Sequence, residues 1–261
     1  MSYALITGAS SGIGAALART YAQHGHSLLL VARSADKLQT LAAELSAQYR
    51  IDAQVLALDL SKPDAPQAVY EFTQQAGVQI EVLVNNAGFA DFGEFWQADW
   101  VKNAEMIDLN VKTLTHLTHL YLPGMVARKS GRVLNVASTA AFQPGPLMSV
   151  YYATKAYVLF FSEAIANELQ GTGVTVTALC PGATESGFQA KAEMGDSKLV
   201  KGKKLPSAAE VAEFGYQAAQ KGRTVAVDGC FNYIQSLAPR FLPRKLVAQV
   251  VRSAQERTHG G

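Results

Sequence analysis

The sequence contains little cysteine and little excess charge. Only two of its 261 residues are cysteines, Cys180 and Cys230, too few for a disulfide framework. Their apolar neighbours predict that both thiols are buried and reduced, as in a cytoplasmic protein. The net charge is +2, so the strong basic excess typical of nucleic-acid-binding proteins is missing. A nucleic-acid partner is therefore not expected.

Long apolar runs are also missing. No stretch reaches the roughly 20 apolar residues that a membrane-spanning helix requires. The longest candidate, residues 150–162, contains Thr154 and Lys155. A first strand is expected to begin at Tyr3, which leaves no room for a secretory signal. Without repeats or linker-like segments, the sequence predicts a soluble cytoplasmic protein with one domain, residues 1–261, and a short C-terminal extension from about residue 229.

What the sequence does contain is a regular alternation of two patterns, within a composition that is 49% hydrophobic. Short runs rich in Val, Leu and Ile predict buried strands at residues 3–7, 27–32, 53–57, 80–85, 132–136, 174–180 and 224–227. Apolar residues at helical spacing predict helices at 13–24, 36–48, 64–76, 108–125, 151–170 and 208–221. Such alternation is typical of βαβ units, so we expect an α/β fold: a three-layer, doubly wound parallel sheet of the Rossmann-like type.

A glycine-rich turn joins the first strand to the first helix. It reads Thr7-Gly8-Ala9-Ser10-Ser11-Gly12-Ile13-Gly14. Glycines here allow a tight turn, close approach of a pyrophosphate to the backbone, and close packing of helix against strand. The free N–H groups at the positive end of the helix then hold the anion. The turn predicts a dinucleotide site, with contacts from Gly8, Ser10, Gly12, Ile13 and Gly14.

The next strand ends predict the rest of this cofactor site. Arg33 follows the second strand, where an enzyme that selects NAD usually carries a carboxylate, so it favours the 2′-phosphate of NADP(H) over NAD(H). A solvated surface arginine is the alternative. Further cofactor contacts are expected where later strands end: Asp59, Leu60, Asn86, Ala87, Gly88, Pro181 and Gly182.

A tyrosine and a lysine four residues apart begin the helix that follows Ser138. Tyr151 and Lys155 share a helix face, so both side chains can reach one site. A nearby ammonium, like the positive ring of an oxidised nicotinamide, lowers the pKa of a phenol and prepares it for proton transfer. Ser138 can hydrogen-bond the substrate oxygen and polarise it. Substrate contacts are therefore expected from Ser138 and Tyr151.

These motifs together resemble the short-chain dehydrogenase/reductase superfamily, in its single-domain branch with a Tyr-x-x-x-Lys motif. The resemblance runs from Thr7 to Val227. It implies a catalytic set made of Asn110, Ser138, Tyr151 and Lys155, with Asn110 perturbing its helix and Lys155 also binding the nicotinamide ribose. It further implies that Asp59 contacts the adenine and that Thr184 or Ser186 binds the nicotinamide carboxamide. Relatives are commonly dimers or tetramers, so a homodimer or homotetramer is expected.

The expected activity is hydride transfer between NADP(H) and an apolar ketone, aldehyde or secondary alcohol. A 3-oxoacyl thioester reductase is the alternative within the class, and a non-enzymatic NADP-sensing scaffold is the alternative outside it. Apolar residues after the catalytic strand ends are expected to wall the substrate pocket: Phe89, Phe92, Phe95, Trp96, Phe142, Leu147, Met148 and Phe188.

Two further features have less bearing on the chemistry. His116 and His119 are three residues apart on a helix, but no other ligand accompanies them, so no metal site is expected. The basic amphipathic tail at residues 240–247 has three possible roles: covering the substrate pocket, packing in a dimer, or touching a membrane surface.

Overall fold

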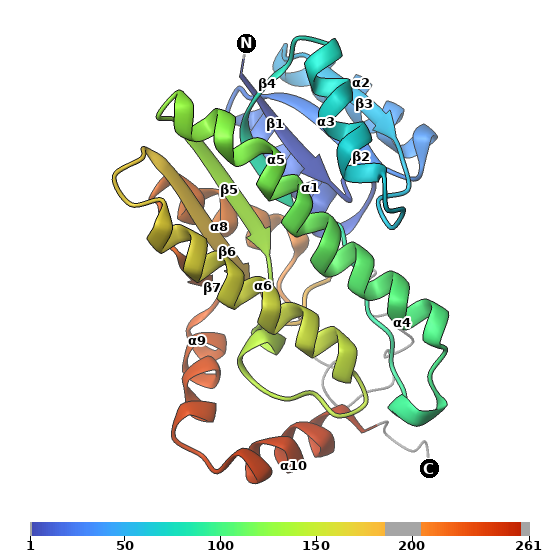
Figure 1. The fold of residues 1–261 in the computed structure, drawn as a ribbon, viewed down its shortest axis with the longest axis vertical. Coiled ribbons are helices and arrows are strands. Elements are labelled where there is room, and N and C mark those ends of the chain that lie inside the picture. The colour runs from blue at the N-terminus through green and yellow to red at the C-terminus, as the bar shows by residue number, and fades with distance from the viewer. Residues whose placement is uncertain (1, 186–204, 257–261) are drawn as a thin grey trace.

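The structure, a computed structural model, describes residues 2–185 and 205–256. Its centre is a sheet of seven parallel strands in the order β3-β2-β1-β4-β5-β6-β7 (Figure 1). The strands are β1 (Ser2–Thr7), β2 (Ser27–Ala32), β3 (Ala53–Ala57), β4 (Gln79–Asn85), β5 (Gly131–Val136), β6 (Val174–Cys180) and β7 (Val225–Val227). The order reverses between β1 and β4, and ligands bind at such a switch point, beyond the carboxyl ends of the strands.

Helices cover both faces of this sheet. They are α1 (Gly12–Gln23), α2 (Ala35–Tyr49), α3 (Ala65–Gln75), α4 (Trp100–Ile107), α5 (Leu114–Ala127), α6 (Ser149–Glu168), α8 (Ala208–Gln220), α9 (Cys230–Leu237) and α10 (Arg244–Gln255). Alternate strand residues face opposite sides: Ile6 packs with α1, α2 and α8, and Leu5 packs with α3, α5 and α6. The two clusters form the two halves of the core, one on each side of the sheet.

The predicted fold class is confirmed. All seven strands and six helices expected from the sequence are present, with limits that differ by at most two residues except at the start of the helix expected at 108–125. The helix expected at 108–125 is longer than predicted, because it is preceded by α4 and by a π-helical segment, Asp108–Thr113. Asp99 begins α4 as its N-cap, its carboxylate accepting from the Val101 N–H at 2.9 Å.

Beyond β7 the chain forms α9, a short 3₁₀ turn (Ala238–Arg240) and α10. Figure 1 shows these elements extending past the carboxyl ends of the strands. Val247 and Val251 of α10 are buried in a cluster with Tyr151 and Tyr152. This packing favours the first of the three roles considered for the basic tail, that of covering the pocket.

One prediction about the cysteines is wrong. Cys180 is buried at the end of β6, but Cys230 is exposed at the start of α9. Its apolar neighbours belong to a helix whose outer face carries Phe231 and Ile234, both more than half exposed, so an apolar neighbourhood in the sequence did not mean burial. In the described ranges, no helix is both long and apolar enough to cross a bilayer.

Candidate active site

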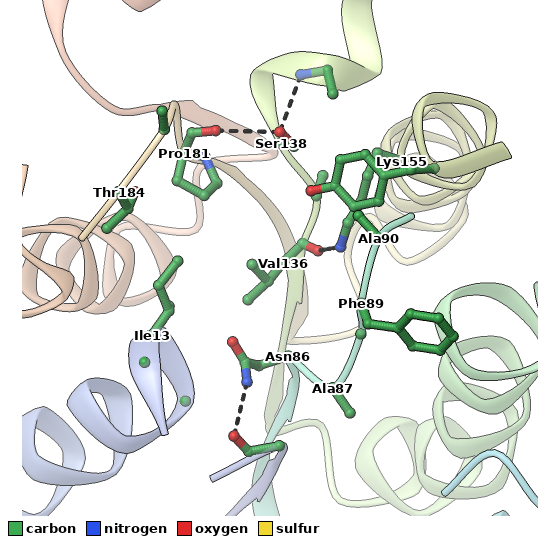
Figure 2. A pocket seen from close by; sticks show the side chains of 18 of the residues that line it. Ile13, Asn86, Ala87, Phe89, Ala90, Val136, Ser138, Lys155, Pro181 and Thr184 are labelled. Atoms are coloured by element: carbon green, nitrogen blue, oxygen red, sulfur yellow. Dashed lines mark hydrogen bonds between the residues drawn. The ribbon is translucent and has the colours of Figure 1, made fainter. Parts of the chain in front are cut away.

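A cavity of about 1000 Å³ opens at the carboxyl edge of the sheet, around the switch point between β1 and β4. It is lined by every described residue that was predicted to contact the cofactor, and by both predicted hydrogen-bonding contacts to the substrate, Ser138 and Tyr151: Gly8, Ser10, Gly12, Ile13, Gly14, Arg33, Asp59, Leu60, Asn86, Ala87, Gly88, Ser138, Tyr151, Lys155, Pro181, Gly182 and Thr184. Figure 2 shows Ile13 and Thr184 on one side of this space and Phe89 and Ala90 on the other. Of the predicted catalytic set, only Asn110 lies outside the lining.

The phosphate end of the cavity depends on glycine. Gly8 has φ +68°, and a Cβ there would lie 2.8 Å from Asn86 Nδ2 and 2.9 Å from Ala87 Cα. A Cβ on Gly14 would lie 2.3 Å from the Gly8 carbonyl oxygen, so α1 packs directly on the turn. Ser11 precedes α1 without a side-chain capping bond, which leaves the first N–H groups of the helix open to an anion. These residues fit a dinucleotide pyrophosphate.

Thr7 and Asn86 tie together the two strand ends that form the switch point. The Thr7 hydroxyl accepts from the N–H groups of Asn86 and Ala87 at 2.9 and 3.0 Å and donates to the Val84 carbonyl at 3.2 Å. The Asn86 amide donates to the Thr7 carbonyl at 2.9 Å. The floor of the cavity is thus held by hydrogen bonds between β1 and β4.

Arg33 and Asp59 lie at the other end of the phosphate region. Arg33 is exposed after β2, at the rim. Burial opposes ionisation of Asp59, but hydrogen bonds from the Ser61 N–H and hydroxyl, with attraction to Arg33 and Lys62, lower its pKa overall. An ionised carboxylate next to a guanidinium could meet the amino group of an adenine and the phosphate of a ribose.

Ser138 and Tyr151 meet at the chemical end. Ser138 caps a short 3₁₀ turn: its hydroxyl accepts from the Ala140 N–H at 3.1 Å and donates to the Pro181 carbonyl at 3.5 Å (Figure 2). Tyr151 is buried in α6, and burial raises the pKa of its phenol, an effect that a hydrogen bond with Ser138 partly offsets. Ser138 and Tyr151 therefore lie at the same wall of the cavity, where a carbonyl oxygen could bind.

Lys155 lies one turn further along α6. Its Nζ donates to the Val136 carbonyl at 2.7 Å (Figure 2). The same atom lies 5.8 Å from the centre of the Tyr151 ring. Burial lowers the pKa of Lys155 to about 8. In this arrangement burial, and not the ammonium, dominates the pKa of Tyr151, so the lowering expected from the sequence does not occur in the protein alone.

Asn110 stands behind the cavity, inside the π-helical segment. Its amide donates to the Phe89 carbonyl at 3.0 Å and to the Thr154 hydroxyl at 3.1 Å, and its Oδ1 accepts from the Phe89 N–H at 3.2 Å. A Cβ on Gly88 would lie 2.8 Å from Asn110 Oδ1 and 3.8 Å from Lys155 Nζ. In the π-helical segment, the Asn110 side chain thus contacts the main chain at residues 88–89, and this main chain separates Asn110 from Lys155.

The wall of the substrate region differs from the prediction. Of the expected apolar residues, Phe89 and Met148 line the cavity. Phe92 and Phe142 pack into core clusters, Leu147 does not reach the cavity, and Phe95 and Trp96 are exposed away from it.

Sequence reasoning missed the lining residues that α9 and α10 contribute, because nothing in their sequence pattern shows that these helices pack over the cavity. These residues are Phe231, Asn232, Gln235 and Ala254. Ser186 and Phe188 lie outside the described residues. Thr184 lines the cavity and donates to the Gly182 carbonyl at 3.0 Å, which leaves open the choice between it and Ser186.

A family model described as short chain dehydrogenase matches residues 2–196, about three quarters of the chain. The chain belongs to this family. The human very-long-chain 3-oxoacyl-CoA reductase is 34% identical over 183 residues, which are 69% of this short-chain dehydrogenase and only 58% of the relative. Sulfoacetaldehyde reductase 2 of Chromohalobacter salexigens is 41% identical over 189 residues, 70% of this chain and 73% of that protein.

Solved structures of other proteins resemble this chain over nearly its whole length. A short-chain dehydrogenase from Sphingobium yanoikuyae, in complex with NADPH, has a TM-score of 0.82 and 31% identity and covers 100% of this chain and 98% of its own. A 7beta-hydroxysteroid dehydrogenase has a TM-score of 0.83 and 26% identity, with 97% of each chain covered. Both structures share the fold of this chain along nearly its full length.

Proposed function

We propose that this short-chain dehydrogenase uses NADP(H) to interconvert an apolar ketone or aldehyde and the corresponding alcohol. One observation carries the proposal: Ser138, Tyr151 and Lys155 line the same cavity as the glycine turn. A scaffold that only senses the cofactor has no need of a buried tyrosine and lysine at the chemical end, so the enzyme is preferred over the non-enzymatic alternative.

Ser138 and Tyr151 each act on the substrate oxygen in this reaction. The bound nicotinamide supplies or accepts the hydride. The Ser138 hydroxyl, whose own donor contact of 3.5 Å is long, turns to hydrogen-bond and polarise the substrate carbonyl oxygen. Tyr151 gives its proton to that oxygen during reduction and takes it back from the alcohol during oxidation. Burial of the phenol among Met106, Met148 and Ala140 keeps water away from this step.

Lys155 and Asn110 support the proton transfer without contacting the reacting oxygen. Lys155 binds the ribose next to the nicotinamide and supplies positive charge below the Tyr151 ring. Asn110 holds the Phe89 main chain and the Thr154 hydroxyl, and so fixes the wall next to Lys155. Asn110 is therefore assigned a positioning role.

The preference for NADP(H) rests on Arg33. The guanidinium is exposed at the rim, close enough to Asp59 to lower the pKa of that carboxyl, and no carboxylate replaces it at the end of β2. An arginine here can hold a 2′-phosphate by charge-assisted hydrogen bonds. The Sphingobium relative, solved with NADPH, supports the same preference.

The test follows NADPH and NADH absorbance with the purified protein and a panel of apolar ketones, aldehydes and 3-oxoacyl thioesters. We expect turnover with NADPH, and a loss of at least about 1000-fold in kcat for Tyr151→Phe, because that variant keeps the ring but loses the transferable proton. NADPH binding by fluorescence is expected to persist in the variant. Equal turnover by both proteins would refute Tyr151 as the acid/base.

Reduction of 3-oxoacyl thioesters is the second candidate. It is favoured by the similarity to a relative named very-long-chain 3-oxoacyl-CoA reductase, although the match spans just over half of that protein. Turnover of a 3-oxoacyl thioester with a higher kcat/KM than any simple ketone would select it. A homodimer or homotetramer and a cytoplasmic location remain predictions for the whole protein.

A further inference from the structure

A second tyrosine adjoins the catalytic one in the cavity wall. Tyr152 follows Tyr151 in α6, is 7% exposed and lines the cavity. The two rings meet edge to face, with centroids 6.1 Å apart. A Cβ on Gly145 would lie 2.1 Å from Tyr152 Cγ, so the loop before α6 leaves room for this ring only because residue 145 is glycine. The ring is held against the catalytic group.

The hydroxyl of Tyr152 is hydrogen-bonded to a residue 103 positions further along the chain. Gln255, the last residue of α10, has no exposed surface, and its Nε2 donates to the Tyr152 hydroxyl oxygen at 2.5 Å. Because the amide occupies a lone pair of that oxygen, the phenolic proton has to point elsewhere. Within residues 2–185 and 205–256, the Tyr152 hydroxyl donates to no other residue, and the Oε1 of the same Gln255 amide is likewise buried without a partner.

A buried donor without an acceptor is unfavourable, and such groups in native proteins usually have a partner. The cavity beside Tyr152 is the space from which that partner can come. Burial also raises the pKa of Tyr152, with the Gln255 hydrogen bond acting against it, so the hydroxyl stays protonated and remains a donor. The group it meets is therefore an acceptor.

We propose that Tyr152, positioned by Gln255, donates a hydrogen bond to a second, neutral oxygen of the substrate, beyond the carbonyl that is reduced. The preferred substrates then carry an additional ketone, ester or thioester oxygen, and Tyr152 determines that preference. The inference rests on the proposed function, because it deepens the substrate class of the same cavity.

A neutral oxygen fits the surroundings better than an anion. Among the described lining residues, the only cations are Arg33, at the rim beside Asp59, and Lys155, which donates to the Val136 carbonyl. Glu105 also lines the cavity and would repel a carboxylate. An anionic group has no described counter-ion of its own here.

The experiment measures a preference. NADPH-dependent kcat/KM is determined for 3-, 4- and 5-oxoesters and for unbranched ketones of the same chain length. The parent is expected to prefer at least one oxoester over its matched ketone. Tyr152→Phe is expected to reduce that preference about tenfold, the contribution of one hydrogen bond between neutral groups. Gln255→Met is expected to reduce it as well, because the proton is no longer directed.

Tyr157→Phe is the matched control, because Tyr157 lies on the same helix and is 39% exposed outside the cavity. It is expected to keep the parent preference. The dissociation constants of the same compounds for the NADPH complexes of Tyr151→Phe and of the Tyr151→Phe, Tyr152→Phe double variant give the preference without turnover. A parent that binds no oxoester better than its ketone, or a Tyr152→Phe protein that keeps the preference, overturns the inference. Loss of turnover alone bears on the proposed function.

Discussion

At the scale of single residues, the site is an electrostatic problem created by burial. Tyr151 and Lys155 are both less than a tenth exposed, and burial raises the pKa of the phenol and lowers that of the ammonium. Each shift favours the neutral form. The cofactor-free protein thus holds a weakly acidic phenol next to a lysine that loses its proton near pH 8. Whenever Lys155 is charged, burying its ammonium costs folding free energy.

This cost predicts a particular pH dependence of stability. The pKa of Lys155 is about 8 in the folded protein and 10.5 when unperturbed, so the unfolded chain binds more protons between these values. The penalty is full below pH 8 and is relieved as the pH rises toward 10.5. Relative to Lys155→Met, the cofactor-free parent should gain about 2–3 kcal/mol in unfolding free energy between pH 7 and pH 10.

Urea unfolding of the two proteins at both pH values measures this difference directly. Other groups titrate in both proteins, so only the difference between them reports on Lys155. Parallel pH dependences would contradict the predicted burial of the charge.

Arg33 permits a prediction about cofactor choice. Arg33→Asp replaces a donor to the 2′-phosphate by a carboxylate that repels it, so the dissociation constant of NADPH should rise about 10- to 100-fold while NADH binding is maintained or improved. Fluorescence titration of both cofactors gives the ratio. Arg223→Asp makes the same charge change at an exposed position outside the cavity and should leave the ratio unchanged. A parent that uses NADH as well as NADPH would show that Arg33 does not select the cofactor.

At the scale of elements, a buried polar network joins the four elements that carry the site. Asn85 of β4 donates to Thr118 of α5 at 3.0 Å and to Asn135 of β5 at 2.9 Å, and Asn135 donates to Ser162 of α6 at 2.9 Å. All four side chains are almost fully buried. The network fixes β4, β5 and α6, and with them the residues that follow: the Asn86–Gly88 turn, the Val136 carbonyl, and Tyr151 and Lys155 on the same helix.

Breaking this network should destabilise the protein more than an apolar substitution of similar size normally does. Asn135→Leu removes two hydrogen bonds. The buried side chains of Asn85 and Ser162 then each have one hydrogen bond fewer. The unfolding free energy should fall by about 2–4 kcal/mol, and kcat should fall with it. Asn167→Leu, on an exposed position of α6, is the control in the same urea experiment. A loss below about 1 kcal/mol would mean that the network contributes little.

At the scale of the whole molecule, the cavity has two parts with different origins. The cofactor part comes from the strand ends and the turns that follow them, whereas α9 and α10 return from the C-terminal end to complete the substrate part. Val247 and Val251 anchor α10, and Arg252 forms an ion pair with Glu94 at 2.7 Å, with both side chains partly exposed. An exposed pair of this kind contributes little, so the apolar contacts hold the helix.

The Val247→Ala, Val251→Ala double variant should therefore separate the two parts. Losing buried methyl groups loosens α10, and kcat/KM for larger ketones should fall about three- to tenfold. The NADPH dissociation constant should stay within about twofold, since the residues that hold the cofactor lie elsewhere. Val250→Ala, at an exposed position on the same helix, should change neither quantity. Parallel losses of cofactor binding and turnover would contradict this division.

The sequence alone determined the sheet, its flanking helices and most of the cofactor site. These follow from local rules: buried parallel strands are continuously apolar, helices repeat every 3.6 residues, and a glycine turn between strand and helix has few other uses. Because parallel strands end at one edge, the residues after them had to come together, which is why Gly8, Asn86, Ser138 and Tyr151 meet in one cavity.

Only the tertiary structure decided what closes the substrate region. Nothing local in Gln255 points to Tyr152, 103 residues away, and nothing local in Phe95 or Trp96 shows that they face solvent. The hydrogen bonds of Asn110 with Phe89 and Thr154 likewise join positions 21 and 44 residues apart in the chain. Periodicity records which face of an element is apolar, but the partner of that face is set by how distant segments pack, and no short stretch of sequence contains that information.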